Sequence, residues 1–584
     1  MNGGVAKPII KQIKDNKESL DFWKKELLPK DDEKIRDIIM NFPTVYIHNW
    51  QDSGAFEVYV GETNNIFKRT RQHYDAASDK SNWQSKLLEK DARLYIIGHE
   101  HFNKSLTLDI ENRLMHYMMS AERVRHVHNL RGNPQRSYYT MDEFDEIFKK
   151  IWRGLRKENK DLFPTENEIK DSAIYKASPL HKLTREQENA RDLIIQKVSK
   201  ALENGERQQL IFIDGEAGTG KTVLNSSTFY ELYCQTEEKK EKLNCYLLVN
   251  HDEQIIVYEQ IAEKLGLVER YGKVVSKPTT FINNHSESDP ADVVFIDEAH
   301  LLLTQGKQSY RGENQLKDVI DRARVTVVMF DENQILTTEQ FWEDQILEKY
   351  RNQAKKANNY IVLDKQLRMQ ADSETIDWID SFTKKGQLKK IPHTCGGYTI
   401  KIFDDPELLD VEIKRRADQS DSALSRVVAT YDWEYSKRHK PEERTKKYWE
   451  VYVGKWHKPW NRELESELTG KEKRNIKRLA WAEQPQTINE VGSTFTIQGF
   501  DLNYVGVILG PSVKYRDGKI IFDPSESHND KAIRNRTLSD GTKHKFGEKL
   551  IQHEVRVLMT RGVNGMYIYA CDPELRVALL KASE

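Results

Sequence analysis

The stretch LIFIDGEAGTGKT, residues 210–222, determines how the centre of this 584-residue chain is expected to fold. Its first half is an apolar strand, and its second half fits the pattern G-x-x-x-x-G-K-[ST] ahead of a helical sequence. Glycines suit such a loop because backbone N–H groups must wrap around phosphates, while the following helix N-terminus adds positive potential. We therefore predict a phosphate-binding loop with Gly215, Gly218 and Gly220 at the turn.

The same loop predicts how ATP and magnesium are held. Lys221 would reach the β and γ phosphates, and the hydroxyl of Thr222 would ligate Mg²⁺. About seventy residues later, DVVFIDEAH (292–300) ends an apolar strand in Asp297 and Glu298. In a parallel sheet that strand end lies beside the phosphate loop, so Asp297 can hold Mg²⁺ and Glu298 can orient the attacking water.

Alternating strands and helices predict an α/β protein around these motifs. A polar connector with two prolines, residues 164–184, precedes them and marks a domain boundary. Apolar strands recur beyond it, separated by helical stretches, which is the pattern of a mostly parallel sheet covered by helices. The expected strands are 208–214, 244–250, 292–297, 324–330 and 360–364, followed by 426–431, 504–510 and 566–571. We therefore expect two parallel-sheet domains, 183–390 and 391–584.

Further motifs follow in an order that resembles helicases and translocases of superfamily 1, with the Schlafen group 3 helicase-domain family as the best match. The motifs are LTREQENA, DENQIL, LDKQLRMQ, TFTIQGFDLNYVGVILG and EVRVLMTRGVNGMYIYA. The resemblance implies two RecA-like domains that close on Mg-ATP. It implies that Gln187 reads adenine, that Gly499 contacts the nucleotide, that Gln334 couples the γ-phosphate to nucleic acid, and that Arg368 and Arg561 contact phosphates, Arg561 as the arginine finger. Asp501 departs from the family, where glutamate is commoner.

Composition excludes several other classes of protein. The formal net charge is −1, which excludes a globally basic nucleic-acid binder but leaves room for a local basic groove. We expect no membrane association and a cytoplasmic location, because no apolar run reaches about 18 residues and the N-terminus lacks the core of a signal peptide. Four scattered cysteines, Cys234, Cys245, Cys395 and Cys571, are expected to be reduced core residues.

An insertion at about residues 433–481 holds five of the eleven tryptophans among many lysines and arginines. Such interleaving suits a groove for single strands, in which bases stack on aromatic rings and cations follow the backbone. The equally weighted alternative is a small subdomain whose core contains the tryptophans and whose charges face water.

The N-terminal sequence carries a different pattern. TVYIHNW (44–50) and the strand ending in Tyr59-Val60-Gly61 are joined by a short turn, and a basic helix carries Arg69 and His73 four residues apart on one face. A later helix, SLTLDIENRLMHYMMSAE, places Glu111 beside an apolar stripe. This order resembles the GIY-YIG endonuclease family, although the first strand lacks the usual glycine.

The resemblance implies a small α/β nuclease domain that hydrolyses phosphodiesters. Tyr46, helped by Tyr59 or His73, would orient or deprotonate water, and Arg69 would stabilise the crowded phosphate. Glu111 would hold one divalent ion, Mg²⁺ or Mn²⁺. Asn129 could correspond to a later asparagine of the family. Each residue alone has a structural explanation, and their joint order carries the prediction.

The predicted map is therefore a helical extension (1–40), a nuclease domain (41–150), a linker (151–182) and the two RecA-like domains. We expect an ATP-dependent translocase or helicase coupled to a nuclease, acting on DNA in preference to RNA and suited to restriction of foreign DNA or phage defence. Two alternatives remain: an ATP-gated, nucleic-acid-sensing switch that does not unwind, and a repair or RNA-processing ATPase whose nuclease-like domain only binds.

Overall fold

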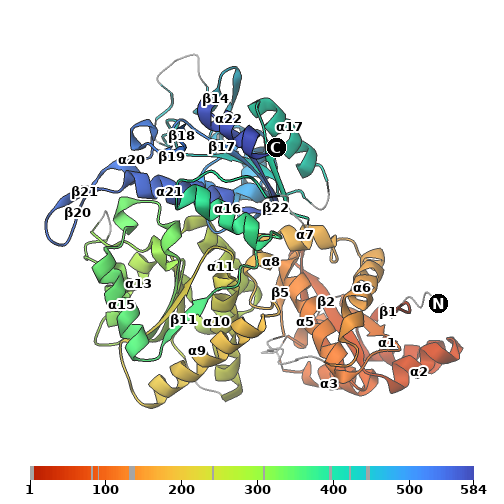
Figure 1. Ribbon diagram of the computed structural model, residues 1–584. Helices are drawn as coiled ribbons and strands as arrows, with labels where there is room; N and C mark the ends of the chain where they lie inside the picture. Colours follow the sequence, from red (N-terminus) through yellow and green to blue (C-terminus); the bar gives the residue numbers. More distant parts are fainter. Residues whose placement is uncertain are drawn as a thin grey trace. The chain divides into compact units, whose positions relative to one another are not determined.

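The computed structural model divides the chain into two compact units (Figure 1). The N-terminal unit comprises residues 1–182, 230–242 and 258–274, and the second unit comprises residues 183–229, 243–257 and 275–584. The residues that the structure describes are 5–79, 83–89, 91–129, 138–239, 243–306, 310–392, 397–419, 422–437, 439–441 and 447–584.

The N-terminal unit is built on a mixed five-stranded sheet in the order β1-β4-β2-β3-β5. All neighbours are antiparallel except β3 and β5, which are parallel. The strands are β1 (Ile9–Lys14), β2 (Thr44–Asp52), β3 (Ala55–Thr63), β4 (Arg93–Gly98) and β5 (Val124–Val127). β2 and β3 form the predicted hairpin, and its turn includes Ser53 and Gly54 with positive φ, which reverses the chain tightly.

Helices cover this sheet. They are α1 (Lys17–Phe22), α2 (Glu33–Asn41), α3 (Ile66–Ala76), α4 (Ser85–Glu89), α5 (Lys104–Ser120), α6 (Phe144–Glu158), α7 (Glu166–Asp171) and α8 (Ala173–Ala177). The predicted stripe of Leu106, Ile110, Leu114 and Met118 on α5 is fully buried. Burial of this stripe fixes the rotation of α5 and hence the position of Glu111.

Two parts of the predicted map differ from the structure. Residues 1–40 were expected to be helical, but Ile9–Lys14 forms β1 and pairs with β4. Residues 151–182 were expected to be a linker, yet α6 continues to Glu158 and buries Ile151, Trp152 and Leu155. The apolar spacing of α6 therefore outweighs the prolines and polar residues that follow it, and this segment is part of the N-terminal unit.

The second unit contains two fully parallel sheets, as the alternation of strands and helices predicts. The first has the order β11-β6-β10-β9-β7-β8. Its strands are β6 (Gln209–Gly215), β7 (Cys245–Val249), β8 (Val275–Ser276), β9 (Ala291–Asp297), β10 (Ala323–Phe330) and β11 (Tyr360–Leu363). The helices in this part of the sequence are α9 (Arg185–Glu203), α10 (Lys221–Lys239), α11 (Asp252–Lys264), α12 (Leu267–Tyr271), α13 (Pro278–Asn284), α14 (Gln315–Asp321) and α15 (Asp344–Lys356). Of these, α12 and the C-terminal parts of α10 and α11 belong to the N-terminal unit. Both sheets are of the type found in RecA-like domains.

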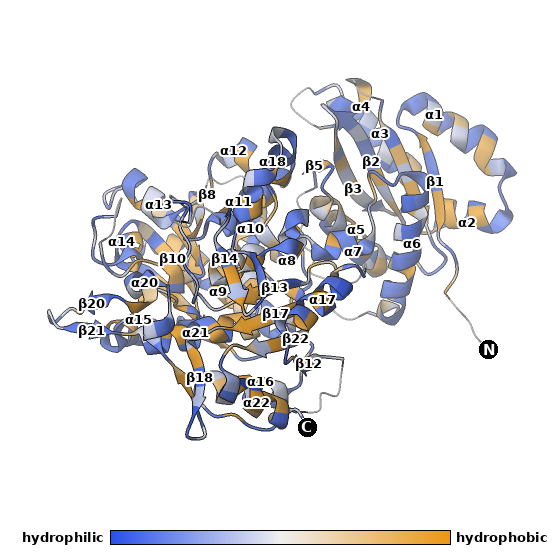
Figure 2. Cartoon of the chain, turned by 90° about the horizontal axis from the view of Figure 1, so that it is seen from above, coloured by the Kyte–Doolittle hydropathy of each residue, from blue (hydrophilic) through white to orange (hydrophobic). Residues whose placement is uncertain are grey.

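The second sheet has the order β12-β22-β17-β13-β16. Its strands are β12 (Thr399–Ile402), β13 (Arg426–Ala429), β16 (Val491–Gly492), β17 (Leu502–Leu509) and β22 (Gly562–Ala570), accompanied by helices α16 (Ser373–Thr383), α17 (Pro406–Ala417), α18 (Gly470–Ile476), α19 (Thr494–Ile497), α20 (Asp530–Ile533), α21 (Gly547–Met559) and α22 (Pro573–Ala582). Figure 2 shows hydrophobic residues concentrated on β17 and β22, whose central positions are fully buried. Three separate two-stranded hairpins occur in this part of the chain: β14 (Glu450–Val453) with β15 (Trp456–Pro459), β18 (Val513–Arg516) with β19 (Lys519–Phe522), and β20 (Asn535–Thr537) with β21 (Lys543–Lys545).

The tryptophan-rich insertion is mainly a subdomain core. Trp433, Trp460 and Trp481 are buried, and Trp449 and Trp456 pack against the cluster that contains Trp433 and Trp460. The indole N–H of Trp481 donates to Glu490 at 2.9 Å. These three buried rings are not accessible to nucleobases, so their role is structural. Residues 438 and 442–446 of the insertion lie outside the described residues.

The cysteine prediction holds where the structure describes it. Cys234 and Cys245 are buried and Cys571 is partly buried, all as free thiols, while Cys395 lies outside the described residues. Burial raises the pKa of Cys571 to about 12, which keeps that thiol protonated. Among the helices that the structure describes, none is both long and apolar enough to cross a membrane.

Candidate active sites

The phosphate loop lies where β6 passes into α10. Gly218 and Gly220 have φ of +87° and +79°, a left-handed conformation that side chains rarely adopt, so glycine is required at both positions. Gly215 has little space as well, because a Cβ there would lie 2.7 Å from the hydroxyl of Thr219. The ammonium of Lys221 donates to the carbonyls of Gly215 at 2.6 Å and Glu216 at 2.9 Å. The loop is thus shaped by the residues that the motif predicted.

The predicted magnesium ligands meet beside this loop. The hydroxyl of Thr222, in the first turn of α10, donates to Asp297 Oδ2 over 3.2 Å, and Asp297 is buried at the end of β9. A hydroxyl next to a buried carboxylate is a donor set that fits Mg²⁺. Parallel pairing of β6 with β10 and of β10 with β9 brings the two strand ends together.

Glu298 follows Asp297 in a left-handed conformation, with φ of +48°, which is uncommon for a residue with a side chain. Its carboxylate lies 3.3 Å from the imidazole of the buried His300. Burial by itself would raise the pKa of Glu298, but the interactions with His300, Lys221 and Arg561 outweigh burial and lower it. Glu298 therefore stays ionised, as a water-orienting carboxylate must.

Gln334 and Arg561 are joined in the structure. Arg561 is fully buried, and its guanidinium donates to Gln334 Oε1 at 2.7 Å and to the carbonyl of Val557 at 3.1 Å. Burial lowers the pKa of Arg561 to about 10, which still leaves it charged at neutral pH. Gln334 also donates to Asp331 at 2.8 Å. These hydrogen bonds connect Arg561, directly before β22, with the residues that follow β10 in the first parallel sheet.

The other predicted nucleotide contacts are in the same region. Gln187, in a capping box with Thr184 at the start of α9, donates to the carbonyl of Thr219 in the phosphate loop at 3.2 Å. Arg368 pairs with Asp501 at 2.5 Å, which gives the departure at position 501 a definite partner. Gly499 has φ of +84°, and a Cβ there would lie 2.3 Å from Gln254.

Sequence motifs did not single out an ion network at the loop. Arg556 on α21 donates to Glu216 Oε2 at 2.5 Å and also pairs with Asp380 on α16. Lys384 donates to Glu216 at 2.7 Å and to Asp380 at 2.9 Å. Asp331, at the end of β10, lies 3.6 Å from Lys221. Except for Asp380 and Lys384, which are four residues apart, these partners are far apart in sequence, so no local pattern could have revealed the network.

The predicted side chains of the N-terminal unit form a second site, which we call the tyrosine cluster: Tyr46, Tyr59, Arg69 and His73. The hydroxyl of Tyr46 lies 3.0 Å from His73 Nε2 and accepts from Arg69 Nε at 3.4 Å. Arg69 and His73 lie one turn apart on α3, which Asn65 caps by accepting from the backbone of Lys68. The Tyr46 and Tyr59 rings stack with centroids 6.2 Å apart.

Burial sets the protonation of this cluster. It raises the pKa of Tyr46 well above the usual value, with a smaller contribution from Tyr59, so the phenol keeps its proton. Burial also lowers the pKa of His73 to about 3, helped by His48 and Arg69, so the imidazole is neutral at physiological pH. A neutral imidazole beside a phenol can accept its proton in a hydrogen bond, which fixes the phenol oxygen for a second partner.

Close packing explains why a glycine lies at position 61, two residues before the end of β3. Tyr46 pairs with Gly61 across the hairpin, and a Cβ on Gly61 would lie 2.5 Å from both Cζ and the hydroxyl oxygen of Tyr46. Glycine is therefore required by close approach of the Tyr46 ring.

Glu111 and Asn129 are placed together by α5 and β5. Glu111 is buried, and Asn129 Nδ2 donates to its Oε1 at 2.9 Å and to the carbonyl of Val60 at 2.6 Å. Asn129 thereby links Glu111 to the strand that carries Tyr59. A carboxylate oriented by an amide is a ligand suited to a hard divalent cation.

The structure adds three residues to this site that the sequence motifs do not predict: Asp15, His48 and Trp83. His48 Nδ1 lies 2.5 Å from Asp15 Oδ2, and the ring of His48 lies 5.2 Å from that of His73. Trp83 stacks on Tyr59 with centroids 4.2 Å apart. His48 could have been found from the strand alternation that places it two residues after Tyr46.

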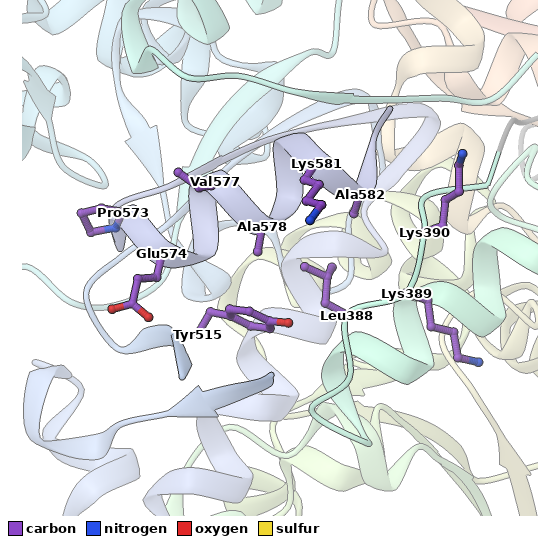
Figure 3. Close-up of a pocket in the computed structure, with 10 residues that line it drawn as sticks. All are labelled: Leu388, Lys389, Lys390, Tyr515, Pro573, Glu574, Val577, Ala578, Lys581 and Ala582. Carbon is purple, nitrogen blue, oxygen red and sulfur yellow. The ribbon is translucent and has the colours of Figure 1, made fainter. Parts of the chain in front are cut away.

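A cavity of about 730 Å³ lies elsewhere, between α22 and the segment after α16 (Figure 3). Its apolar lining includes Leu388 and Val577, and Lys389, Lys390 and Lys581 are among its lining residues. None of the predicted site residues lines it. It is therefore separate from the chemistry predicted for this chain.

Comparison with protein families finds a match over the part of the chain that contains the two parallel sheets. A family model described as Schlafen group 3, DNA/RNA helicase domain, matches residues 208–572. An uncharacterized protein of Saccharomyces cerevisiae is 30% identical over 436 residues, covering 69% of this chain and 91% of that protein.

Two solved structures are similar at a lower level. The Pif1 helicase from Candida albicans is 14% identical with a TM-score of 0.21, covering 41% of this chain and 55% of its own, so the chain spans about half of that structure. A structure titled as the basis for DNA unwinding at forked duplexes by two coordinating Pif1 helicases is 11% identical with a TM-score of 0.24, covering 68% of this chain and 94% of its own. Similarity this low carries no information on activity.

Proposed function

This chain belongs to the Schlafen group 3 DNA/RNA helicase-domain family, and from that premise we propose that it is an ATP-driven nucleic-acid translocase joined to a metal-dependent nuclease. The helicase domain implies ATP hydrolysis with Mg²⁺ and binding of nucleic acid. The nuclease is the additional element of the proposal, and it rests on the tyrosine cluster. We propose DNA as the substrate, in a role such as restriction of foreign DNA.

The residues of the second unit fit Mg-ATP. Thr222 and Asp297 would hold the ion, Lys221 would neutralise the phosphates, and Glu298 would orient water, all within one buried edge of the sheet. Arg561 is charged at neutral pH, and its planar fork can bind two oxygens of the γ-phosphate, a role worth roughly 10³ to 10⁵ in rate. Its hydrogen bond to Gln334 supports a function that links the two parallel sheets.

The observation that carries the nuclease proposal is the convergence of Tyr46, Arg69 and His73 on one hydroxyl, from two elements. Because Tyr46 keeps its proton, its role is to orient the attacking water, with the neutral His73 accepting its hydrogen bond. Arg69 would stabilise charge on the phosphate. The buried carboxylate of Glu111 would hold a divalent ion, which supplies Lewis-acid stabilisation of the leaving oxygen when bound.

The test compares wild type with Lys221→Ala, Arg69→Ala and Glu111→Gln on labelled single-stranded, duplex and forked DNA and RNA, with Mg²⁺ and with or without ATP. We expect Arg69→Ala and Glu111→Gln to abolish cutting while ATP hydrolysis continues. Lys221→Ala should abolish ATP hydrolysis and any ATP dependence of cutting. Lys68→Ala, next to Arg69 but exposed, is the matched control and should cut normally.

The outcomes separate the possible functions. If wild type hydrolyses ATP but cuts none of these substrates, the nuclease proposal fails and a binding role for the N-terminal unit takes its place. If cutting requires ATP but no strand is displaced from forked substrates, the protein is an ATP-gated switch rather than an unwinding motor.

A further inference from the structure

Three potential metal ligands lie together on the N-terminal sheet: Glu57 on β3, His126 on β5 and His128 directly after β5. Glu57 pairs with His126 across the parallel strands, and His128 is two residues further along, so the strand alternation places all three on one face. Trp50 pairs with Glu57, and His48 pairs with Tyr59, in the antiparallel register of β2 and β3. This face is therefore the one that carries Tyr46 and Tyr59.

The geometry of the three side chains is compact. One ligand atom from each lies within 4.8 Å of the others. Glu57 Oε2 is 2.8 Å from His128 Nε2, and the rings of His126 and His128 stack with centroids 4.0 Å apart. The side chains of Glu57 and His128 are 13% and 15% exposed, so an ion could reach them from solvent without unfolding the strands.

We propose that Glu57, His126 and His128 form a binding site for Zn²⁺ or a similar divalent transition ion, distinct from Glu111 and from the magnesium ligands of the second unit. Two imidazoles and one carboxylate are a ligand set that zinc prefers, at roughly 2.0–2.2 Å from the metal. Three protein ligands leave a fourth position for water. Small rotations of partly exposed side chains would bring atoms within 4.8 Å to tetrahedral spacing.

Neighbouring residues give the site a consequence for the tyrosine cluster, and this part rests on the proposed nuclease. Asn129 follows His128 directly and holds Glu111 and the carbonyl of Val60. The indole of Trp83 stacks on Tyr59 and has its centroid 6.3 Å from that of His128. An ion bound by His126 and His128 would therefore fix the end of β5 and, through Asn129, the orientation of the Glu111 carboxylate.

The test measures zinc binding by the full chain, independently of any nuclease activity. Protein stripped with chelator is titrated with Zn²⁺ against a chromophoric indicator in excess Mg²⁺, which occupies carboxylate sites, and bound zinc is counted by elemental analysis after gel filtration. We expect one ion per chain. The variants Glu57→Gln and His126→Ala/His128→Ala should each weaken binding by about tenfold or more.

Controls separate this site from others. His457→Ala removes an exposed histidine that pairs with Glu450 at 3.1 Å, and it should leave binding unchanged. Glu111→Gln should also bind zinc normally. His128→Cys keeps a zinc ligand and should retain binding, which guards against loss through misfolding. Co²⁺ in place of Zn²⁺ should give the visible absorption of a tetrahedral site in wild type and not in the double variant.

Equal zinc affinity in wild type and the double variant would overturn the proposal. Loss of zinc in Glu111→Gln but not in Glu57→Gln would assign the ion to the nuclease carboxylate instead. If one zinc binds as expected while no substrate is cut, the metal site stands and the nuclease fails.

Discussion

The tyrosine cluster depends on the absence of a side chain at Gly61. The ring of Tyr46 occupies the space where Gly61 would carry a side chain, and this places the Tyr46 hydroxyl against both His73 and Arg69. A glycine in a strand normally costs stability, because it has no side chain to pack and loses more backbone entropy on folding. At position 61 the absence of a side chain leaves the space that the Tyr46 ring occupies.

Gly61→Ala should therefore displace Tyr46 and lower nuclease activity by about 100-fold, since a misplacement of about 1 Å can cost that much. ATP hydrolysis should not change. The measurement is the rate of cleavage of the best DNA substrate under single-turnover conditions. Gly470→Ala, at a position where a Cβ would meet nothing within 4 Å, is the control. Full cleavage by Gly61→Ala would mean that the position of Tyr46 is not critical.

Residue motifs were predictable where the chemistry is local in sequence. The phosphate loop, Asp297 and the spacing of Arg69 and His73 each follow from a short pattern, and the structure brings them into the expected neighbourhoods. Arg556 was missed because its partners, Glu216 and Asp380, are 340 and 176 residues away. Asp15 was missed because it follows β1, a strand that the charged N-terminus concealed.

Helix α21 is one of the elements that connect the two parallel-sheet parts of the second unit. Arg556 lies within it, and Arg561 follows its end; their side chains reach Glu216 of the phosphate loop and Gln334 respectively. The apolar face of the helix is buried at Leu550, Ile551 and Val555, so its rotation is fixed by packing. Arg556 is thus held within the helix, and Arg561 lies two residues after its end.

This geometry predicts energetic coupling between α21 and α16. A double-mutant cycle on Arg556→Ala and Asp380→Ala should give a coupling energy of about 1–3 kcal/mol, measured by urea unfolding, because Arg556 is nearly buried and shared by two carboxylates. The exposed pair Lys317 and Asp321 on α14 is the control and should give about 0.3–0.5 kcal/mol. Equal coupling energies for both pairs would show that the Arg556 pair stabilises the fold no more than an exposed ion pair does.

The strands of the second unit can be predicted from the sequence, whereas the role of the tryptophan-rich insertion cannot. The eight strands expected in the second unit all appear, because buried parallel strands read as apolar runs. The sequence of the tryptophan-rich insertion is compatible with two roles, since a ring that stacks on bases and a ring in a small core have the same sequence pattern. Burial of Trp433, Trp460 and Trp481 resolves their role.

Across the whole molecule, buried histidines make stability depend on pH. Burial lowers the pKa of His73 to about 3, and burial together with His181 lowers the pKa of His116 well below its usual value. In the unfolded chain these groups take up protons near pH 6.5, whereas in the folded chain they do not. Their contribution is complete above about pH 6.5 and is lost as the pH falls toward 3.

We therefore expect the urea concentration at the unfolding midpoint of the N-terminal unit to decrease when the pH is lowered from about 7.5 to about 5.5. Each such histidine adds up to about 1.4 kcal/mol per pH unit to the slope of the unfolding free energy. His116→Gln should flatten the slope by up to one proton, whereas His544→Gln, at an exposed position, should not. A midpoint that does not change with pH, or that rises on acidification, would contradict the assignment of neutral buried histidines.

The N-terminal unit is assembled from three segments that are separated in the sequence. Segments 230–242 and 258–274 belong to this unit, although they lie within the sequence of the first RecA-like domain. The N-terminal unit is therefore not a continuous stretch of sequence: a fragment that stops at Lys182 lacks part of this unit and should be less stable to proteases than the full chain. Recombination that exchanged only the first 182 residues with a relative would replace one part of this unit and leave the other part behind.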